Sequence, residues 1–389
     1  MYQVDGLRDV YIIGIGQSKF GKQPQISAEE LGVIAADAAI KDAGVDPRKF
    51  DVAYAGRIED ASTTAQAILQ HFGVEYIECI NVENACSTGA TAVHGLWKDI
   101  AFGIHDIGIA IGVESLSTSP LAGGLVPSAK GSFNDQIGFI PLAGTGQTVH
   151  RLMKTRGLTI EEMCYPSWKN HRAALYNPYA HYRKEISIDD IVHGNMVSSP
   201  VTNLMCCPMS DGAAAVIMCT KEIAMQYTTK LVKMDASLLT SGMFIKGNGA
   251  EVDMNIGFPR AARETYEMAG VGPKDLDLVE LHDAFSHEEL LCYEEMGLCD
   301  VGDCKKLVHD KYCEYGGRTP FNLSGGLLSL GHPLGASGAR VVVDVVRQLR
   351  HEADPGIQIA DPHIGFCQMR GGSLYGRSGE AVYTAIVTK

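Results

Sequence analysis

Apolar positions along this chain recur with two different periods, which predict strands and helices in alternation. The run VYIIGIG around residues 11–17 is almost continuously apolar, as buried strands are. The segment SAEELGVIAADAAIKDAGV has its apolar residues on one helical face, and Ser27 and Glu30 at its start have the spacing of a capping box. The strand-like run DVAYAG follows. The beginning of the chain is therefore predicted to be an α/β unit.

A second unit with the same order lies far downstream. The helical pattern AARETYEMAGV is followed by KDLDLVELHDAF, and the pair aligns with the AGV and DVAYAG of the first unit. The glycine-containing turn and helix ACSTGATAV also has a counterpart, GHPLGASGARVVVDVV at 331–346. A single match of this kind carries little weight, because the pattern of a helix followed by a strand is common in α/β proteins. Two matching segments in the same order favour an internal duplication. We therefore predict two halves, residues 1–230 and 231–389.

The segment between about 115 and 210 departs from this pattern. Its first part is rich in Gly, Ser and Pro, and its second part predicts a helix followed by an aromatic, basic loop. A bare loop of this length is rare in a compact domain, so we predict a loop domain inserted in the first half. Its basic side chains, among them Arg183 and Lys184, form either a solvated surface or an anion-binding cover for phosphates.

Composition narrows the classes of protein to which the chain can belong. Of its 389 residues 46% are apolar and 20% charged, as in globular proteins with a large core, and the net charge of −13 argues against nucleic acid as the main partner. No apolar run approaches the roughly 20 residues of a membrane span, and no secretory signal is visible. The eleven cysteines lack the spacing of a disulfide framework or a zinc site. We therefore expect a cytoplasmic protein with free thiols.

Cys86 is the first candidate for chemistry. It follows the strand-like run VEYIECINV and precedes a helix pattern of small residues, which places its thiol at a strand-to-helix turn. Free backbone N–H groups and the positive end of the helix dipole favour a thiolate there, and a thiolate is the nucleophile that accepts acyl groups. A buried structural cysteine is the alternative.

Three further residues stand at comparable places. His282 follows a strand that ends at Leu281, at the edge of the sheet where ligands usually bind. His332 lies in the glycine-rich loop of NLSGGLLSLGHPLGASGAR, just before a helix. Cys367 lies in IGFCQMRGGSLYGRSGEAVYTAIV, which predicts a loop between two strands. These positions distinguish the three residues from the other histidines and cysteines, for which a core or surface role is expected.

The motifs ACSTG, HDAF and GGLLSLGHPLGASG, with a late cysteine near glycines, together resemble those of the thiolase superfamily. HDAF, in place of Asn-Glu-Ala-Phe, and the segment NHRAALYNPYAHYRKEIS are similar to the sterol-carrier-protein and archaeal-type branch. The resemblance covers essentially the whole chain. It implies a thiolase fold, an α/β fold in which two duplicated halves form a five-layered αβαβα core with a loop domain inserted in the first half.

The resemblance also implies a reaction. Cys86 would carry the acyl group of an acyl-CoA as a thioester, and His332 would take the thiol proton and keep the sulfur ionised. His282 would bind the thioester oxygen of the second substrate, while backbone N–H groups of Cys86 and of Gly371 and Gly372 would stabilise the other oxyanion. Cys367 would be the acid/base at the acetyl Cα. Coenzyme A is expected as a substrate, with no tightly bound cofactor and no metal.

The sequence departs from the family pattern near Cys367. The late cysteine of the family is followed by a small residue and glycine, but here by Gln368-Met369-Arg370, and the Asp-Cys-Phe of the branch has Ala284 in place of its cysteine. Arg370 and Arg377 are candidates to bind a carboxylate on the acyl chain, or else belong to a surface loop or subunit contact. Further candidates for contacts with substrate or CoA are Arg183, Lys184 and Ser210.

We therefore predict a thiolase that cleaves or forms a 3-oxoacyl-CoA. The expected substrate is carboxylated or aromatic, such as benzoylsuccinyl-CoA, or else acetoacetyl-CoA in a route to 3-hydroxy-3-methylglutaryl-CoA. A decarboxylating ketosynthase of the same fold fits HDAF less well, and a catalytically silent acyl-CoA-binding scaffold is the alternative of another class. The branch further implies a homodimer or a dimer of dimers, often with a separate small zinc-ribbon/OB-fold subunit, for which this chain has no spacing of its own.

Overall fold

The computed structural model describes residues 6–59, 62–119, 136, 141–242, 257–372 and 381–389. Among these residues nine strands form one mixed sheet in the order β3-β2-β4-β7-β1-β8-β11-β10-β9. The ladder between β1 and β8 holds two residue pairs, Tyr11 with Lys233 and Ile12 with Val232. This short join divides the sheet into two wings: a first wing from β3 to β1 and a second wing from β8 to β9.

The first wing is built from the earlier part of the chain and the second wing from the later part. The strands of the first wing are β1 (Val10–Gln17), β2 (Val52–Gly56), β3 (Glu78–Val82), β4 (Ile107–Ser115) and β7 (Asp211–Thr220). Those of the second wing are β8 (Val232–Ser241), β9 (Leu278–Glu280), β10 (Ile364–Gly371) and β11 (Ala381–Thr388). The division of the chain between residues 230 and 231 lies between β7 and β8 and stays a prediction.

Helices alternate with these strands along the chain. In the first half they are α1 (Ala28–Ala43), α2 (Thr64–Leu69), α3 (Thr88–Ala101), α5 (Pro141–Arg156), α6 (Ile160–Ala174), α7 (Ile188–Val192) and α8 (Lys221–Tyr227). In the second half they are α9 (Gly257–Ala269), α10 (Ser286–Glu295), α11 (Cys304–His309) and α12 (Leu334–Leu349). A short hairpin of β5 (Met196–Ser198) and β6 (Val201–Thr202) stands apart from the large sheet. No helix among the described residues is long and apolar enough to cross a membrane.

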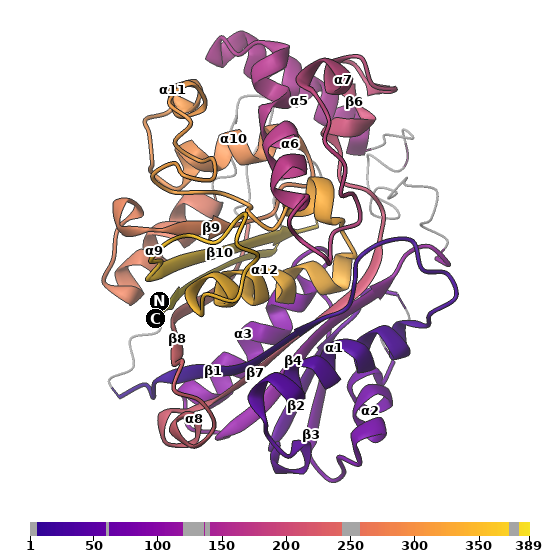
Figure 1. Cartoon of the computed structure of the whole chain (residues 1–389), viewed down its shortest axis with the longest axis vertical. Helices are drawn as coiled ribbons and strands as arrows, with labels where there is room; N and C mark the ends of the chain where they lie inside the picture. The colour runs from indigo at the N-terminus through magenta and orange to yellow at the C-terminus, as the bar shows by residue number, and fades with distance from the viewer. Residues whose placement is uncertain (1–5, 60–61, 120–135, 137–140, 243–256, 373–380) are drawn as a thin grey trace.

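Two helices, α3 and α12, occupy the centre of the molecule between the wings (Figure 1). They pack on each other, and each contacts strands of both wings. On the outer faces, α1 packs on β1 and β7 of the first wing, and α9 packs on β8 and β11 of the second. The layers are therefore helix, sheet, helix, sheet, helix. This arrangement confirms the α/β thiolase fold with a five-layered core that the motifs imply.

The local signals of the sequence explain the first unit well. The Ser27 hydroxyl accepts a hydrogen bond from the Glu30 N–H, and the Glu30 carboxylate accepts one from the Ser27 N–H, so the capping box begins α1 as predicted. The helix ends at Gly44, whose φ of 64° suits glycine. Every residue of β1 is buried, as the apolar run predicts for a strand covered on both faces.

The excursion after β4 carries its own small structure. Helices α5, α6 and α7 and the β5–β6 hairpin gather at one end of the molecule, beside α10 and α11 of the second half (Figure 1). Apolar residues from both sides share one core there; examples are Val149, Leu152 and Met163 from the excursion and Leu290 and Leu307 from the second half. The excursion therefore joins the two halves above the centre of the molecule.

Candidate active site

Cys86 lies in a tight turn between β3 and α3. The Ser87 N–H donates to the Asn84 carbonyl at 3.0 Å, and Ala85 has a φ of 49°, which is uncommon for a residue other than glycine. The thiol therefore stands at a strained strand-to-helix turn, just ahead of the first residue of α3. On its other side lies Gly371, where a Cβ would come within 2.7 Å of the Cys86 nitrogen. Only glycine lets β10 approach the turn this closely.

His332 comes from the second half, at the matching turn before α12. Its Nδ1 lies 2.8 Å from the Ser337 hydroxyl, which itself donates to the Pro333 carbonyl at 3.0 Å. Because the hydroxyl hydrogen is used there, Ser337 accepts Nδ1–H from His332, and the unprotonated nitrogen is Nε2. The Nε2 atom is buried without a hydrogen-bond partner among the described residues. His332 is therefore set up as a proton acceptor.

His282 follows β9 at the edge of the second wing. Its backbone N–H donates to the Gln368 side chain at 3.0 Å, and its Nδ1 lies 3.2 Å from the Glu288 carboxylate. Burial raises the pKa of Glu288, but the positive charges of Arg370 and His282 outweigh burial and hold this pKa well below its usual range. Glu288 is therefore negatively charged, and the Nδ1 side of the His282 ring faces its carboxylate.

The two histidines converge on the thiol. The Cys86 Sγ and one ring nitrogen each of His282 and His332 lie within 4.8 Å of one another, and the two rings meet edge to face with centroids 5.4 Å apart. Three elements that are far apart in the sequence therefore build one site. A sulfur and two imidazole nitrogens at this spacing also match the donors that zinc prefers. The expectation that the protein carries no metal stays a prediction.

The protonation state of Cys86 differs from the sequence-based expectation of a thiolate. Burial raises the pKa of the Cys86 thiol to about 12, and the negative charge of Glu288 adds to this. Backbone N–H groups of Cys86 and Gly372 lower this pKa, but by less than burial raises it. Burial also lowers the pKa of His332 well below its ordinary value, and the charge of His282 adds to this. At neutral pH the site therefore holds a neutral thiol beside a neutral imidazole.

Two family models match the chain. The model of the thiolase N-terminal domain matches residues 10–222, and the thiolase C-terminal domain-like model matches residues 251–383. The chain belongs to the thiolase family. The turns of Cys86 and His332 lie inside these matches, one in each model.

Curated relatives of this thiolase span nearly its whole length. The benzoylsuccinyl-CoA thiolase subunit BbsB of Thauera aromatica is 34% identical, covering 95% of this chain and 97% of the relative. An acetyl-CoA acetyltransferase of Methanothermobacter thermautotrophicus is 33% identical over 94% of this chain and 97% of its own. Sterol carrier protein 2 of Bos taurus is 34% identical over 91% of this chain and 69% of its own. The chain is therefore an acyltransferase of the branch that its motifs resemble.

Solved structures agree with the fold. The Ltp2–ChsH2(DUF35) aldolase aligns with a TM-score of 0.82 over 99% of both chains at 21% identity. The Acat5 thiolase of Ascaris suum in complex with coenzyme A aligns with a TM-score of 0.73 over 98% of this chain and 100% of its own, at 19% identity. At these identities the likeness concerns the fold.

The structure does not bring Cys367 to the other candidates. The sequence pattern predicted a loop, but Cys367 lies inside β10, fully buried, and its thiol donates to the Val341 carbonyl of α12 at 3.6 Å. It shares a strand face with Gly371, which does reach Cys86, but four residues separate them, about 13 Å along a strand. The active-site end of β10 is at Gly371, whereas the sequence pattern had placed the end of the strand before Cys367.

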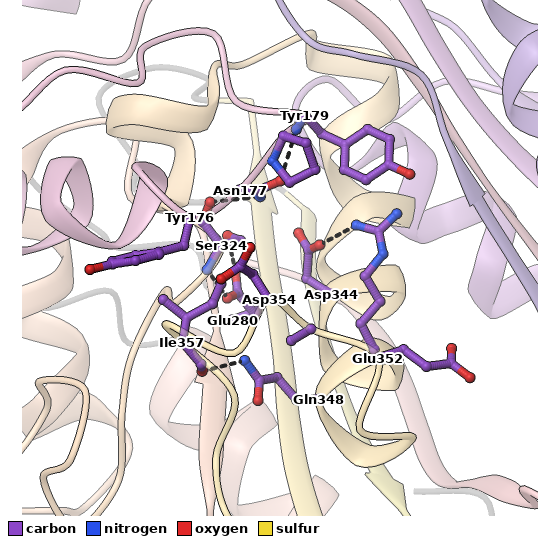
Figure 2. Close-up of a pocket in the computed structure, with 13 residues that line it drawn as sticks. Tyr176, Asn177, Tyr179, Glu280, Ser324, Asp344, Gln348, Glu352, Asp354 and Ile357 are labelled. Carbon is purple, nitrogen blue, oxygen red and sulfur yellow. Dashed lines mark hydrogen bonds and ion pairs between the residues drawn. The ribbon is translucent and has the colours of Figure 1, made fainter.

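The surroundings of Cys367 point in the same direction. Its register partner on β9 is Glu280, which lines a separate cavity of about 320 Å³ beside α12. Figure 2 shows Glu280 and Ser324 in this cavity, with Asp344 beside them and the rings of Tyr176 and Tyr179 on either side. Burial raises the pKa of Glu280 to about 7, although a buried arginine lies at 2.6 Å. None of the three converging residues of the active site lines this cavity.

Replacing Cys367 with alanine should therefore leave carbon–carbon chemistry within about twofold of the wild type. The free energy of unfolding should fall by about 1 kcal/mol, because a packed sulfur is lost from the core. Acyl-CoA cleavage and urea denaturation measure the two effects. A Cys367→Ala variant that still acylates Cys86 but no longer makes or breaks the carbon–carbon bond would show that Cys367 is the acid/base after all.

The remaining candidates are placed as follows. Arg370 is mostly buried, and its guanidinium lies 3.8 Å from both Glu288 and Glu295, so it is engaged by carboxylates of α10. The buried Ser210 hydroxyl lies 2.8 Å from a ring nitrogen of His181. Arg183 and Lys184 are exposed. Arg377 lies outside the described residues.

Sequence reasoning missed Glu288, and it gave no role to Cys207, whose backbone N–H donates to the carbonyl of Ala284 in the loop of His282. Glu288 lies in the first turn of α10, where an acidic residue is ordinarily taken for a helix-capping residue, and it does approach the Phe285 N–H at 3.4 Å. Cys207 is marked in the sequence only by the adjacent Cys206. Neither signal shows that the chain folds back onto His282.

Proposed function

We propose that this acyltransferase cleaves or forms a 3-oxoacyl-CoA through an acyl group carried on Cys86. The observation that supports this most directly is the convergence of one thiol and two histidines within 4.8 Å, drawn from both halves of the chain. A nucleophile beside an imidazole whose free nitrogen can accept a proton is the arrangement that covalent acyl transfer requires.

The roles follow from the hydrogen bonds of each residue. His332 takes the proton of Cys86 at Nε2 as the sulfur adds to the carbonyl carbon, because Nδ1–H is held by Ser337. The backbone N–H groups of Cys86 and Gly372, which already interact with the sulfur, are placed to stabilise the oxyanion on the acyl group. In its protonated form His282, beside Glu288, donates from Nε2 to the thioester oxygen of the second substrate.

The substrate is proposed to be a carboxylated or aromatic 3-oxoacyl-CoA such as benzoylsuccinyl-CoA. Support comes from BbsB, which is 34% identical over nearly the full length of both chains. Arg370 gives this proposal little support, because its guanidinium already pairs with the carboxylates of two glutamates. Acetoacetyl-CoA is the second candidate, supported by the archaeal acetyl-CoA acetyltransferase at 33% identity.

Coenzyme A is proposed to enter over the basic segment that follows α6. The Tyr182 N–H donates to the Ser329 carbonyl at 3.0 Å, which ties this segment to the loop of His332 and leaves Arg183 and Lys184 exposed beside it. Two exposed cations there suit the phosphates of CoA in a chain of net charge −13. The Ser210 hydroxyl, bound to His181, is proposed to support this loop.

Other subunits are also proposed. Strand β3 forms an edge of the sheet, is only partly buried, and is preceded by the fully exposed Tyr76, so a second copy of the chain is proposed to pair there. BbsB is by name a subunit, and the structural neighbour Ltp2–ChsH2(DUF35) is a complex. A separate small zinc-ribbon/OB-fold subunit is therefore proposed as a partner.

The test is a covalent adduct. Wild-type protein incubated with acetyl-CoA, benzoyl-CoA or acetoacetyl-CoA should gain the mass of one acyl group, located by peptide mass spectrometry on Cys86 and not on the neighbouring Cys79, with Cys86→Ala as the blank. The acyl group that is retained identifies the substrate class. A protein that binds these thioesters yet never gains an acyl group on Cys86 is the silent scaffold, and the thiolase proposal is then wrong.

A further inference from the structure

The segment Cys206–Met209 runs between the two histidine loops of the active site. The Cys207 N–H donates to the carbonyl of Ala284, two residues after His282, at 2.9 Å. The next residue, Pro208, accepts the backbone N–H of His332 at 3.2 Å, and Met209 pairs with His332 in a parallel bridge. Cys207 is therefore tied by its backbone to both loops that bring the histidines to Cys86.

Acidic groups near the two histidine loops act on the thiol of Cys207. Burial raises its pKa well above the ordinary value, and the acidic groups of Cys206, Cys86, Asp283 and Glu288 raise it further. Cys207 also keeps partial solvent access, as Cys86 does, whereas Cys367 has none.

The neighbouring thiol points elsewhere. Cys206 has an extended backbone, with φ −118° and ψ 146°, so consecutive side chains leave it on opposite sides. Its Sγ donates to the Thr202 carbonyl at 3.5 Å. Among the described residues the Cys207 sulfur has no such hydrogen bond, and the Nε2 atoms of His282 and His332, on side chains 6% and 3% exposed, are also unpartnered. The described residues therefore leave the Cys207 thiol and both Nε2 atoms without a hydrogen bond, and the backbone of Cys207 contacts the loop of His282.

Carbon–carbon chemistry needs a proton donor and acceptor besides His332, because His332 already holds the proton of Cys86. We propose that Cys207 is this second acid/base, acting at the C2 carbon of the thioester. The proposal rests on the thiolase activity proposed above. It assigns to Cys207 the role that the sequence alone suggested for Cys367.

The protons balance in the cleavage direction as follows. Cys86 sulfur adds to C3 of the 3-oxoacyl-CoA while its proton passes to His332, the C2–C3 bond breaks, and the electron pair goes to C2. C2 takes the proton of the Cys207 thiol, and the first product leaves. The thiol proton of the incoming CoA then passes to the Cys207 thiolate, CoA sulfur attacks the acyl-Cys86 thioester, and Cys86 leaves with the proton from His332.

The environment suits this role. Because its pKa is raised, the Cys207 thiol remains protonated at neutral pH and has a proton to give when C2 becomes a carbanion. In the condensation direction, the CoA thiolate released by acylation takes that proton. The Cys207 thiolate, strongly basic in the same surroundings, then removes the proton from C2.

The experiment separates proton transfer at C2 from acylation. Wild type, Cys207→Ser, Cys207→Ala and the matched control Cys206→Ser are given acetyl-CoA or succinyl-CoA in D2O, and deuterium at C2 is measured by mass spectrometry. Acylation of Cys86 by acetyl-CoA or benzoyl-CoA is measured in parallel. Both Cys207 variants should lose about 100-fold or more in exchange and turnover, with acylation within about threefold of wild type. Cys206→Ser should behave as wild type in both.

Two results would overturn the assignment. One is undiminished exchange in Cys207→Ala. The other is an equal loss of acylation and exchange in both Cys207 variants, which would mean that the residue only supports the loops. A wild type that neither acylates nor exchanges would instead refute the thiolase proposal itself, and this assignment with it.

Discussion

Replacing His332 with alanine is expected to slow acylation of Cys86 by roughly 10² to 10⁴ at pH 8, the range typical of a lost general base. The Cys86 pKa of about 12 gives the physical reason. Without a base, attack depends on the thiolate already present, which is on the order of 10⁻⁴ of the thiol at pH 8. The other imidazole nitrogen of the described cluster belongs to His282, which faces Glu288 and is therefore not expected to replace His332.

The pH dependence distinguishes this role from a structural one. In wild type, the pKa of His332 lies well below its usual value, so the base is neutral and ready at every pH between about 7 and 9, and acylation should change little there. In His332→Ala, the thiolate fraction rises tenfold per pH unit, and the acylation rate should rise with it. Rapid-quench mass spectrometry of the Cys86 peptide measures both rates.

Two further variants give graded comparisons. His332→Asn keeps a polar side chain without a base and should match the alanine variant. Ser337→Ala keeps the base but removes the acceptor of its Nδ1–H, and should cost about tenfold because the tautomer is no longer fixed. A His332→Ala variant that acylates at the wild-type rate with no slope in pH would show that Cys86 ionises without His332.

The sequence predicts the nucleophile and both histidines because each follows a regular pattern. Cys86 and His332 precede helices rich in small residues, α3 and α12, and His282 follows an apolar strand. Strand ends and helix starts meet at one edge of an α/β sheet, so positions in the chain translate into positions in space. The duplicated order supplies the match between the two halves.

The other parts of the site depend on contacts that no local pattern encodes. Cys367 was misplaced because periodicity does not show where β10 ends, and a shift of four residues moves a side chain by about 13 Å. Arg370 was a candidate either for a substrate carboxylate or for a surface loop or subunit contact, but in the fold its guanidinium pairs with carboxylates of α10. The thiolate expected from the helix dipole is outweighed by burial, and burial is a property of the packed structure.

Replacing Glu288 with glutamine is expected to reduce cleavage by about 10² while leaving acylation of Cys86 within a few-fold of wild type. Glutamine keeps the shape of the side chain but removes the charge 3.2 Å from His282 Nδ1. The anion that pairs with His282 is then lost, and with it the placement of the Nε2 donor for the thioester oxygen; one such donor is typically worth 10² to 10³ in rate. Steady-state cleavage and single-turnover acylation measure the two steps separately.

The control for this variant is Glu295→Gln. Glu295 lies on the same helix and at the same 3.8 Å from Arg370 as Glu288 does, but it is not paired with His282. The Glu295→Gln variant should be less stable than the wild type, but it should not lose cleavage activity as Glu288→Gln does. Equal losses of cleavage in both variants would mean that the pairing of Arg370 matters and that His282 needs no anion behind it.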